Sequence, residues 1–282
     1  MKTISLILPT LNNPKGLNLF LKSVYLGNTK KVKIEIIIID QSDSDEIYNV
    51  CNNYDKKGNP FIIYKRSNVL GLSLNRNFGI QFATGDIVGF PDDDCTYYPD
   101  TLENILNCFL DVEFKENDAI LGQIYDNNNR QPIIKNWPQK KLKVTIFNFY
   151  KLSSSITLFC KKNKVKFNES MGAGTTFGSC EDTDYIYNML VLKKKLIYCP
   201  NVKVWHSEIN YNEVSLKRVE SYASGLGYFI TNGITFVKVG LLLGCILIKG
   251  KQALISQSSY RTGYFRNYFK GLTRGLQQKK IK

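Results

Sequence analysis

A run of six residues limits the folds open to this chain more than any other feature of its sequence. Residues 35–40 read EIIIID, with four consecutive β-branched, apolar isoleucines. Alternate side chains of a strand point to opposite faces, so an unbroken apolar strand must be covered on both sides. Such strands are typical of parallel sheets with helices on both faces. The run therefore predicts a central strand of an α/β sheet.

Strand and helix patterns alternate along the first 110 residues. Short apolar runs predict strands at 4–8, 35–40, 61–64 and 87–90, and apolar spacing or initial prolines predict helices at 14–26, 70–83 and 99–109. This alternation indicates an open α/β sheet with right-handed crossovers. Farther along, we expect a helix over 181–194 and strands at 196–198 and 202–205.

Polar and acidic residues follow the carboxyl ends of several predicted strands. Pro9 and Thr10 follow the first strand, Asp40 ends the second, and residues 92–94 (DDD) follow the fourth. Open α/β sheets bind ligands in the crevice beyond the carboxyl ends of their strands. One edge of the sheet is therefore predicted to gather these side chains.

The three successive aspartates, 92–94, are unusual in a chain with a net charge of +14. Their mutual repulsion is unfavourable unless water or a cation relieves it. Mg²⁺ and Mn²⁺ prefer oxygen ligands, and along an extended stretch Asp92 and Asp94 would lie on the same side. Spacing alone leaves two interpretations open, a divalent metal site and a solvated acidic turn.

Two later patterns also admit a functional and an ordinary interpretation. His206, the only histidine, follows the predicted strand 202–205 and is either an ordinary histidine or, near the acidic strand, a ligand for an Mn²⁺-like metal. Residues 181–184 (EDTD) begin a helix, where acids either stabilise the N-terminus or include a general base. The nearby glycines at 172, 174 and 178 would allow close approach of a ligand to the backbone.

Five ordered motifs over roughly residues 3–207 resemble family 2 glycosyltransferases, which are inverting enzymes with the GT-A fold. The motifs are ILPTLNN, EIIIIDQSDSD, GLSLNRNFGIQFATGDIVGFPDDDC, GAGTTFGSCEDTDYIYNML and NVKVWH. The third motif contains a DxD element and the fourth an ED pair. Gln41 departs from the pattern, because a second acid is common there. The resemblance implies an α/β fold, namely a GT-A (Rossmann-like) mixed sheet flanked by helices.

The resemblance also implies a role for each matching residue. Asp182 would be the catalytic base, and Glu181 would position the sugar or the acceptor. Asp94, the last residue of the DxD element, and His206 would bind Mn²⁺ or Mg²⁺. The implied nucleotide-binding residues are Pro9, Thr10, Asn12, Asp40, Asn75, Arg76, Asp92 and Asp93.

The implied reaction is a single displacement at the anomeric carbon of a nucleotide sugar. A UDP-hexose is the expected donor, and a hydroxyl of a glycan or lipid-linked acceptor in bacterial surface polysaccharide synthesis is the expected nucleophile. Asp182 would deprotonate that hydroxyl, while the metal neutralises the departing diphosphate. A cation and a diphosphate in one pocket would explain why acids gather in a basic chain.

The positive charge is concentrated in the tail. Residues 221–282 contain ten Lys and Arg and no Asp or Glu, so +10 of the net charge of +14 lies there. Residues 239–248 are apolar but shorter than the ~20 residues of a spanning helix, and aromatic and basic residues interleave over 260–270. This composition predicts a membrane-associating helical extension on an anionic membrane surface. A core-packed helical hairpin with a solvated basic end and a true span are the alternatives.

These patterns predict a GT-A catalytic domain at 1–210 and a basic amphipathic helical extension at 211–282. Within the first, 1–112 would be the nucleotide-binding half and 113–210 the acceptor-binding half. The seven cysteines include no CxxC pair, and the first residues do not resemble a signal peptide. We therefore expect a cytoplasmic protein, peripheral on the inner face of the cell membrane.

Three rival functions fit the sequence less well. A nucleic-acid-binding basic protein would leave the acidic clusters unexplained, since they repel phosphate. A nucleotidyltransferase would carry a Gly-rich, basic loop after the first strand, where this chain has PTLNNPKG. A transferase-like protein that binds without turnover would not need both Asp94 and Asp182. The expected partners are thus a nucleotide-sugar donor and an acceptor, and not a nucleic acid.

Overall fold

A computed structural model describes residues 2–29, 31–55, 58–111, 116–207, 214–255 and 260–278. The chain divides into two compact units. Unit 1 comprises Met1–Leu70, Leu74–Lys166 and Tyr185–Glu208, and unit 2 comprises Gly71–Ser73, Phe167–Asp184 and Ile209–Lys282. Unit 2 thus joins residues 167–184 to the C-terminal helices. The division into domains at 1–210 and 211–282 stays a prediction.

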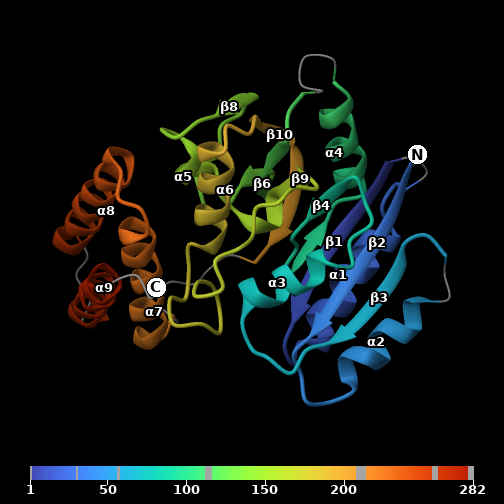
Figure 1. The fold of residues 1–282 in the computed structure, drawn as a ribbon, viewed down its shortest axis with the longest axis horizontal. Helices are drawn as coiled ribbons and strands as arrows, with labels where there is room; N and C mark the ends of the chain where they lie inside the picture. Colours follow the sequence, from blue (N-terminus) through green and yellow to red (C-terminus); the bar gives the residue numbers. More distant parts are fainter. Residues whose placement is uncertain are drawn as a thin grey trace. The chain divides into compact units, whose positions relative to one another are not determined.

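Unit 1 contains a mixed sheet with the spatial order β3–β2–β1–β4–β9–β6–β10–β5 (Figure 1). The neighbours from β3 to β4 are parallel, as are β6 and β10, whereas β9 is antiparallel to β4 and β6, and β5 is antiparallel to β10. The strands are β1 Lys2–Thr10, β2 Val32–Asp40, β3 Phe61–Arg66, β4 Ile87–Gly89, β5 Cys95–Tyr97, β6 Ala119–Asp126, β7 Gln131–Pro132, β8 Leu142–Val144, β9 Leu158–Lys161 and β10 Leu196–His206.

Helices flank this sheet (Figure 1). They are α1 Pro14–Tyr25, α2 Glu46–Asp55, α3 Leu72–Ile80, α4 Thr101–Leu110, α5 Phe149–Leu152 and α6 Glu181–Val191, with a 3-10 turn at Ser155–Thr157. The first residues of α3 and of α6 belong to unit 2. Both helices are shorter than the sequence predicts, ending at residue 80 instead of 83 and at 191 instead of 194.

The central strand β2 is buried on both faces. Its four isoleucines, 36–39, have no exposed surface, and β2 lies between β1 and β3 in parallel register. The expectation of a doubly covered parallel strand is therefore confirmed. The register pairs Thr10 with Asp40, so β1 and β2 end side by side.

The two strands expected at 196–198 and 202–205 form one strand, β10. Its pairing with β6 shifts register between Tyr198 and Lys203. Pro200 lies inside this interval and has no backbone N–H for the ladder, which accounts for the irregularity. The sequence pattern therefore suggested two strands at a place where one strand only changes its register.

Unit 2 combines a glycine-containing loop with three helices. The helices are α7 Leu216–Thr231, α8 Phe236–Ile255 and α9 Tyr260–Gln277. The backbones of α7 and α9 approach closely at Gly227 and Gly275, where a Cβ on Gly227 would lie 2.9 Å from the Cα of Gly275. Over the described ranges, no helix is both long and apolar enough to cross a bilayer.

Candidate functional site

Hydrogen bonds join the carboxyl ends of β1 and β2 into one corner. Gln41 donates its backbone N–H to the carbonyl of Thr10 at 2.9 Å. The backbone N–H of Asn12 donates to Ser42 Oγ at 2.8 Å, and the N–H of Ser42 donates to Asp40 Oδ1 at 2.9 Å. Asn12 is exposed at this corner and adopts a positive φ of 52°, which asparagine tolerates.

Asp40 is held by the protein itself. Its side chain is fully buried, and its Oδ2 accepts from the Tyr64 hydroxyl at 2.7 Å with Arg66 Nη2 at 3.6 Å. Burial, reinforced by the bond to Asp40, raises the pKa of Tyr64 to about 12, which keeps that hydroxyl a donor. Asp40 and the buried Pro9, which pairs with Ile39, shape the corner from behind. Their predicted contacts with a nucleotide stay predictions.

The three aspartates after β4 diverge toward three different partners. Asp92 accepts from Arg76 at 2.7 Å, and Asp94 Oδ1 lies 3.3 Å from His206 Nε2. Asp93 accepts from Thr10 Oγ1 at 2.5 Å and from Asn13 Nδ2 at 2.9 Å. Residues 93 and 94 lie in a turn, so the extended geometry expected from the sequence is wrong. The turn lets each carboxylate point a different way.

Arg76 and Asn75 are positioned by α3 and are fully buried. Arg76 Nη2 donates to Asp92 and also to Ser155 Oγ at 2.9 Å, and Asn75 Nδ2 donates to the Val69 carbonyl at 2.8 Å. The guanidinium that the sequence assigns to a nucleotide thus neutralises an aspartate of the acidic turn. Arg76 thus holds the acidic turn, and Asn75 holds the loop that contains Val69. Direct contact of either residue with a donor stays a prediction.

Asp92 and Asp93 of the acidic turn are partly buried, whereas Asp94 is exposed. Burial raises the pKa of Asp92, although Arg76 opposes the shift. Burial likewise raises the pKa of Asp93, and outweighs the bonds from Thr10 and Asn13. Carboxylates held in this way gain stability from any cation nearby.

His206 reaches the acidic turn because β10 pairs with β5. The antiparallel register places His206 opposite Cys95, the residue that follows Asp94. Burial lowers the pKa of His206, but the bond to Asp94, the Ser207 carbonyl and the charge of Asp92 outweigh this and raise it above its usual value. The strand pairing thus creates a close carboxylate–imidazole pair.

The Asp94–His206 pair suits a divalent metal. His206 Nδ1 lies 2.7 Å from the Ser207 carbonyl, so a neutral ring that donates there presents the lone pair of Nε2 toward Asp94. Metal-binding histidines commonly donate their other ring N–H to a carbonyl in this way. Within the described ranges, no group of three or more His, Cys, Asp and Glu side chains is arranged to hold a metal. Asp94 and His206 are two side chains that could hold Mn²⁺ if diphosphate or water oxygens completed the set of ligands.

In unit 2, α6 begins with the acids Glu181 and Asp182. Asp182 is half-buried, and its Oδ1 accepts from the N–H of Thr183 at 2.6 Å and from its hydroxyl at 3.2 Å. Glu181 packs against Gly172, where a Cβ would lie 3.2 Å from the carboxyl carbon. Gly172 has a φ of +98°. Gly172 thus lets the Glu181 side chain approach the backbone closely, and the approach of a ligand to this glycine stays a prediction.

The segment leading into Glu181 is held by α7, a support that the sequence reasoning missed. Gly178 donates its N–H to the Ser221 carbonyl at 3.2 Å, and Ser179 Oγ donates to the Tyr222 carbonyl at 2.7 Å. The ring of Phe177 stacks on the ring of Tyr228 of α7, with centroids 4.0 Å apart and an interplanar angle of 6°. In the sequence, only the small and aromatic residues of 221–228 (SYASGLGY) indicate that α7 could pack closely against this segment.

Comparison with known proteins gives a family model and several relatives. The model described as Glycosyl transferase family 2 matches residues 5–182, more than half of the chain. The poly(ribitol-phosphate) β-N-acetylglucosaminyltransferase TarP of Staphylococcus aureus is 32% identical over 180 residues, which cover 59% of this chain and 53% of TarP. The chain spans about half, or less, of the length of the curated relatives it matches.

Solved structures share the fold. Residues 1–349 of S. aureus TarS in complex with UDP-GlcNAc match with a TM-score of 0.63 and 16% identity, over 96% of this chain and 82% of that one. A mannosyltransferase from Pyrobaculum calidifontis, in complex with GDP-Man and Mn²⁺, matches with a TM-score of 0.65 and 14% identity, over 98% and 88% of the two chains. The expected mixed α/β sheet flanked by helices is thus confirmed.

Proposed function

The chain belongs to glycosyl transferase family 2, and from that premise we propose that it is an inverting, metal-dependent hexosyltransferase. One observation carries the metal-dependent part: Asp94 and His206 meet at the edge of the sheet, as ligands for Mn²⁺ or Mg²⁺ would. The complex of TarS with UDP-GlcNAc supports a UDP-hexose type of donor. The name of TarP supports an acceptor in a bacterial surface polymer.

The donor side of the proposal belongs to unit 1. Asp94 and His206 would hold the cation, which when bound neutralises the charge that develops on the diphosphate. Arg76 holds Asp92 in place, and Thr10 holds Asp93, so the turn keeps its form when the donor binds. The exposed Asn12 is the residue of the corner best placed to touch the nucleotide.

The acceptor side of the proposal belongs to the first turn of α6. Asp182 takes the proton of the acceptor hydroxyl, and the hydroxyl oxygen then bonds to the anomeric carbon as the bond to the diphosphate breaks. Attack from the face opposite the diphosphate inverts the configuration. Thr183 orients the carboxylate of Asp182, and Glu181 positions the sugar or the acceptor. A lipid-linked acceptor would be met at the inner face of the cell membrane, which is part of this proposal.

The substitution Asp182→Asn tests the proposed base. Because a general base contributes about 10²–10⁴-fold, transfer should fall by at least about a hundredfold while donor affinity changes by only a few-fold. Transfer is followed by release of UDP, and affinity by calorimetry with UDP and Mn²⁺. Asp100→Asn, the same change on the exposed start of α4, is the matched control and should leave both unchanged. Loss of donor binding in Asp182→Asn would show that the base is misassigned.

A further inference from the structure

Helix α8 turns an apolar stripe to the outside of unit 2. Phe236, Val239, Leu243 and Leu247 recur at helical spacing, and their side chains are 99%, 40%, 57% and 73% exposed. Side chains three or four residues apart share one face of a helix. Water therefore meets a continuous row of large apolar groups along about three turns of α8.

Lys238 and Lys249 of the same helix point inward. Lys238 is 1% exposed, and its Nζ donates to the carbonyls of Phe229 at 2.7 Å and Asn232 at 2.6 Å, at the C-terminus of α7. Lys249 Nζ donates to the hydroxyl of Tyr264 on α9 at 2.9 Å. A helix on a water-exposed surface normally has the opposite arrangement, with charges outside and apolar groups inside. The inverted arrangement indicates that something other than water covers the outer face of α8.

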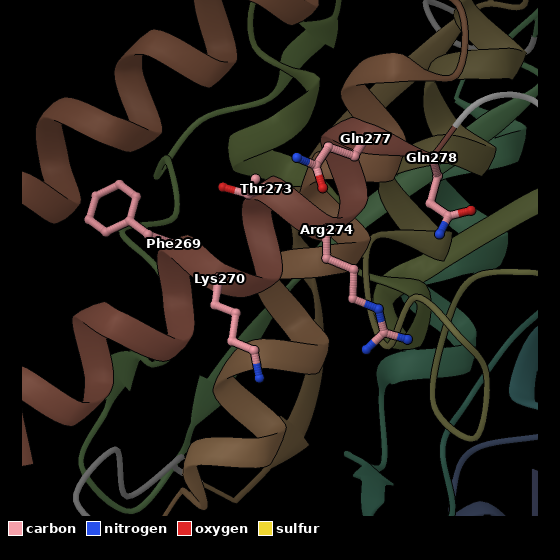
Figure 2. Close-up of a pocket in the computed structure, with 6 residues that line it drawn as sticks. All are labelled: Phe269, Lys270, Thr273, Arg274, Gln277 and Gln278. Atoms are coloured by element: carbon pink, nitrogen blue, oxygen red, sulfur yellow. The ribbon is translucent and has the colours of Figure 1, made fainter.

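Helix α9 of unit 2 carries an exposed basic row on the side of Glu220 of α7. Arg266, Lys270 and Arg274 are exposed at spacings of four residues. Figure 2 shows Lys270 and Arg274 projecting from α9 where they line a shallow pocket with Phe269. Lys270 is also 3.0 Å from Glu220 of α7, so among the described residues of this row the two arginines carry most of the unpaired charge.

We propose that unit 2 binds the surface of an anionic phospholipid bilayer, with the α8 stripe (Phe236, Val239, Leu243 and Leu247) at the acyl boundary and Arg266 and Arg274 at headgroup phosphates. This inference rests on the membrane location that is part of the proposed function, and it names the surface of unit 2 that would contact the membrane. A bilayer offers an apolar layer and negative charge together.

The charge of the tail selects this occupant over a second copy of the chain. Residues 221–282 contain ten basic residues and no acid, so two copies meeting through these helices would repel each other. An anionic leaflet attracts the same charge. Each basic residue near such a surface contributes about 1 kcal/mol, so the loss of one arginine corresponds to about fivefold in affinity.

The experiment uses the full chain and sedimentation with vesicles of phosphatidylcholine, with and without phosphatidylglycerol, at low salt. The wild type should sediment with the anionic vesicles and be released by salt. The double variant Leu243→Asn/Leu247→Asn should lose binding to both kinds of vesicle. The control Leu19→Asn/Leu26→Asn, which changes two leucines of unit 1 that are 58% and 70% exposed, should bind like the wild type.

The double variant Arg266→Gln/Arg274→Gln tests the electrostatic part. It should lose about 25-fold in affinity for anionic vesicles, fivefold for each arginine, and much of the salt dependence. Equal binding to both vesicle types by the wild type, or wild-type binding by the α8 variant, would overturn the proposal. So would light scattering that shows a dimer which the α8 variant dissociates.

Hydrolysis of UDP-hexose without vesicles separates this proposal from the proposed function. Both variants of unit 2 should retain Mn²⁺-dependent hydrolysis, because the substituted side chains are exposed and lie outside the donor site. Loss of vesicle binding with hydrolysis intact would concern the membrane surface alone. Hydrolysis that is absent or independent of Mn²⁺ in the wild type, with vesicle binding intact, would refute the proposed function alone.

Discussion

The close packing of α7 against α9 makes Gly275→Ala a demanding test of this structure. A Cβ at Gly275 would lie 2.2 Å from the carbonyl oxygen of Ser224 and 2.7 Å from the nitrogen of Tyr228. Unbonded heavy atoms of this kind settle at about 3.5 Å, so the two helices would have to separate by about 1 Å. Both obstructing atoms belong to the backbone of α7, so no side-chain rotation relieves the clash.

The magnitude follows from two opposing effects. Overpacking of a well-packed contact lowers the free energy of unfolding by about 1–3 kcal/mol. Alanine in place of glycine within a helix raises it by about 0.5–1 kcal/mol. Gly240→Ala on α8 is the matched control, because no atom lies within 4 Å of a Cβ there and only the favourable effect remains. The two variants should therefore differ by about 1–3 kcal/mol, the overpacking cost itself.

Thermal unfolding measures this difference. For a chain of this size about 2–4 °C corresponds to 1 kcal/mol, so Gly275→Ala should melt about 2–12 °C below Gly240→Ala. Transfer should also slow in Gly275→Ala, because α7 carries the carbonyls of Ser221 and Tyr222 that hold the segment before Glu181. Equal melting temperatures for the two variants would refute the contact between α7 and α9.

Two further predictions concern buried carboxylates and the metal pair. Glu35 has no exposed surface, and its carboxylate accepts hydrogen bonds from the backbone N–H of Thr84 at 2.5 Å and from the Thr84 hydroxyl at 2.7 Å. Glu35→Ala should therefore lower the free energy of unfolding, measured in urea, by at least about 2 kcal/mol. An unchanged urea midpoint would contradict this. Calorimetry should show tighter UDP binding with Mn²⁺ than with EDTA, and Asp94→Ala should remove the difference. That difference should shrink as the pH falls through the raised pKa of His206, because the proton competes for Nε2, and a pH-independent difference would argue against His206 as a ligand.

The metal-free Asp94–His206 pair should show the opposite pH dependence. Because the pKa of His206 is raised in the folded protein, the pair stabilises the fold fully below the ordinary value near 6.5. That contribution is lost as the pH rises through the raised pKa. Since Asp94 is 53% exposed, solvent screening keeps it small.

The sequence alone was sufficient for the central strands and for the residues at their ends. The four successive β-branched isoleucines of β2 favour a strand that is covered on both faces. Parallel neighbours then bring Thr10 and Asp40 to one edge, as the register shows. These are local consequences of side-chain periodicity, which a single sequence contains in full.

Partners brought together from distant parts of the chain could not be derived in this way. The pairing of β10 with β5 places His206 beside Asp94, and the packing of α3 gives Arg76 to Asp92. The sequence named all four residues but could not show that Arg76 meets Asp92, because a buried arginine and an exposed one have the same pattern of neighbours along the chain.

For the C-terminal helices, too, the sequence determined the composition and the tertiary structure determined which side chains are buried. Their composition showed that the tail is basic and partly apolar, which depends only on which residues are present. Tertiary packing decided that Lys238 turns inward, that Leu243 and Leu247 turn outward, and that α7 supports the segment before Glu181. Burial depends on which surfaces meet, and that is a property of the whole folded chain and of no single segment within it.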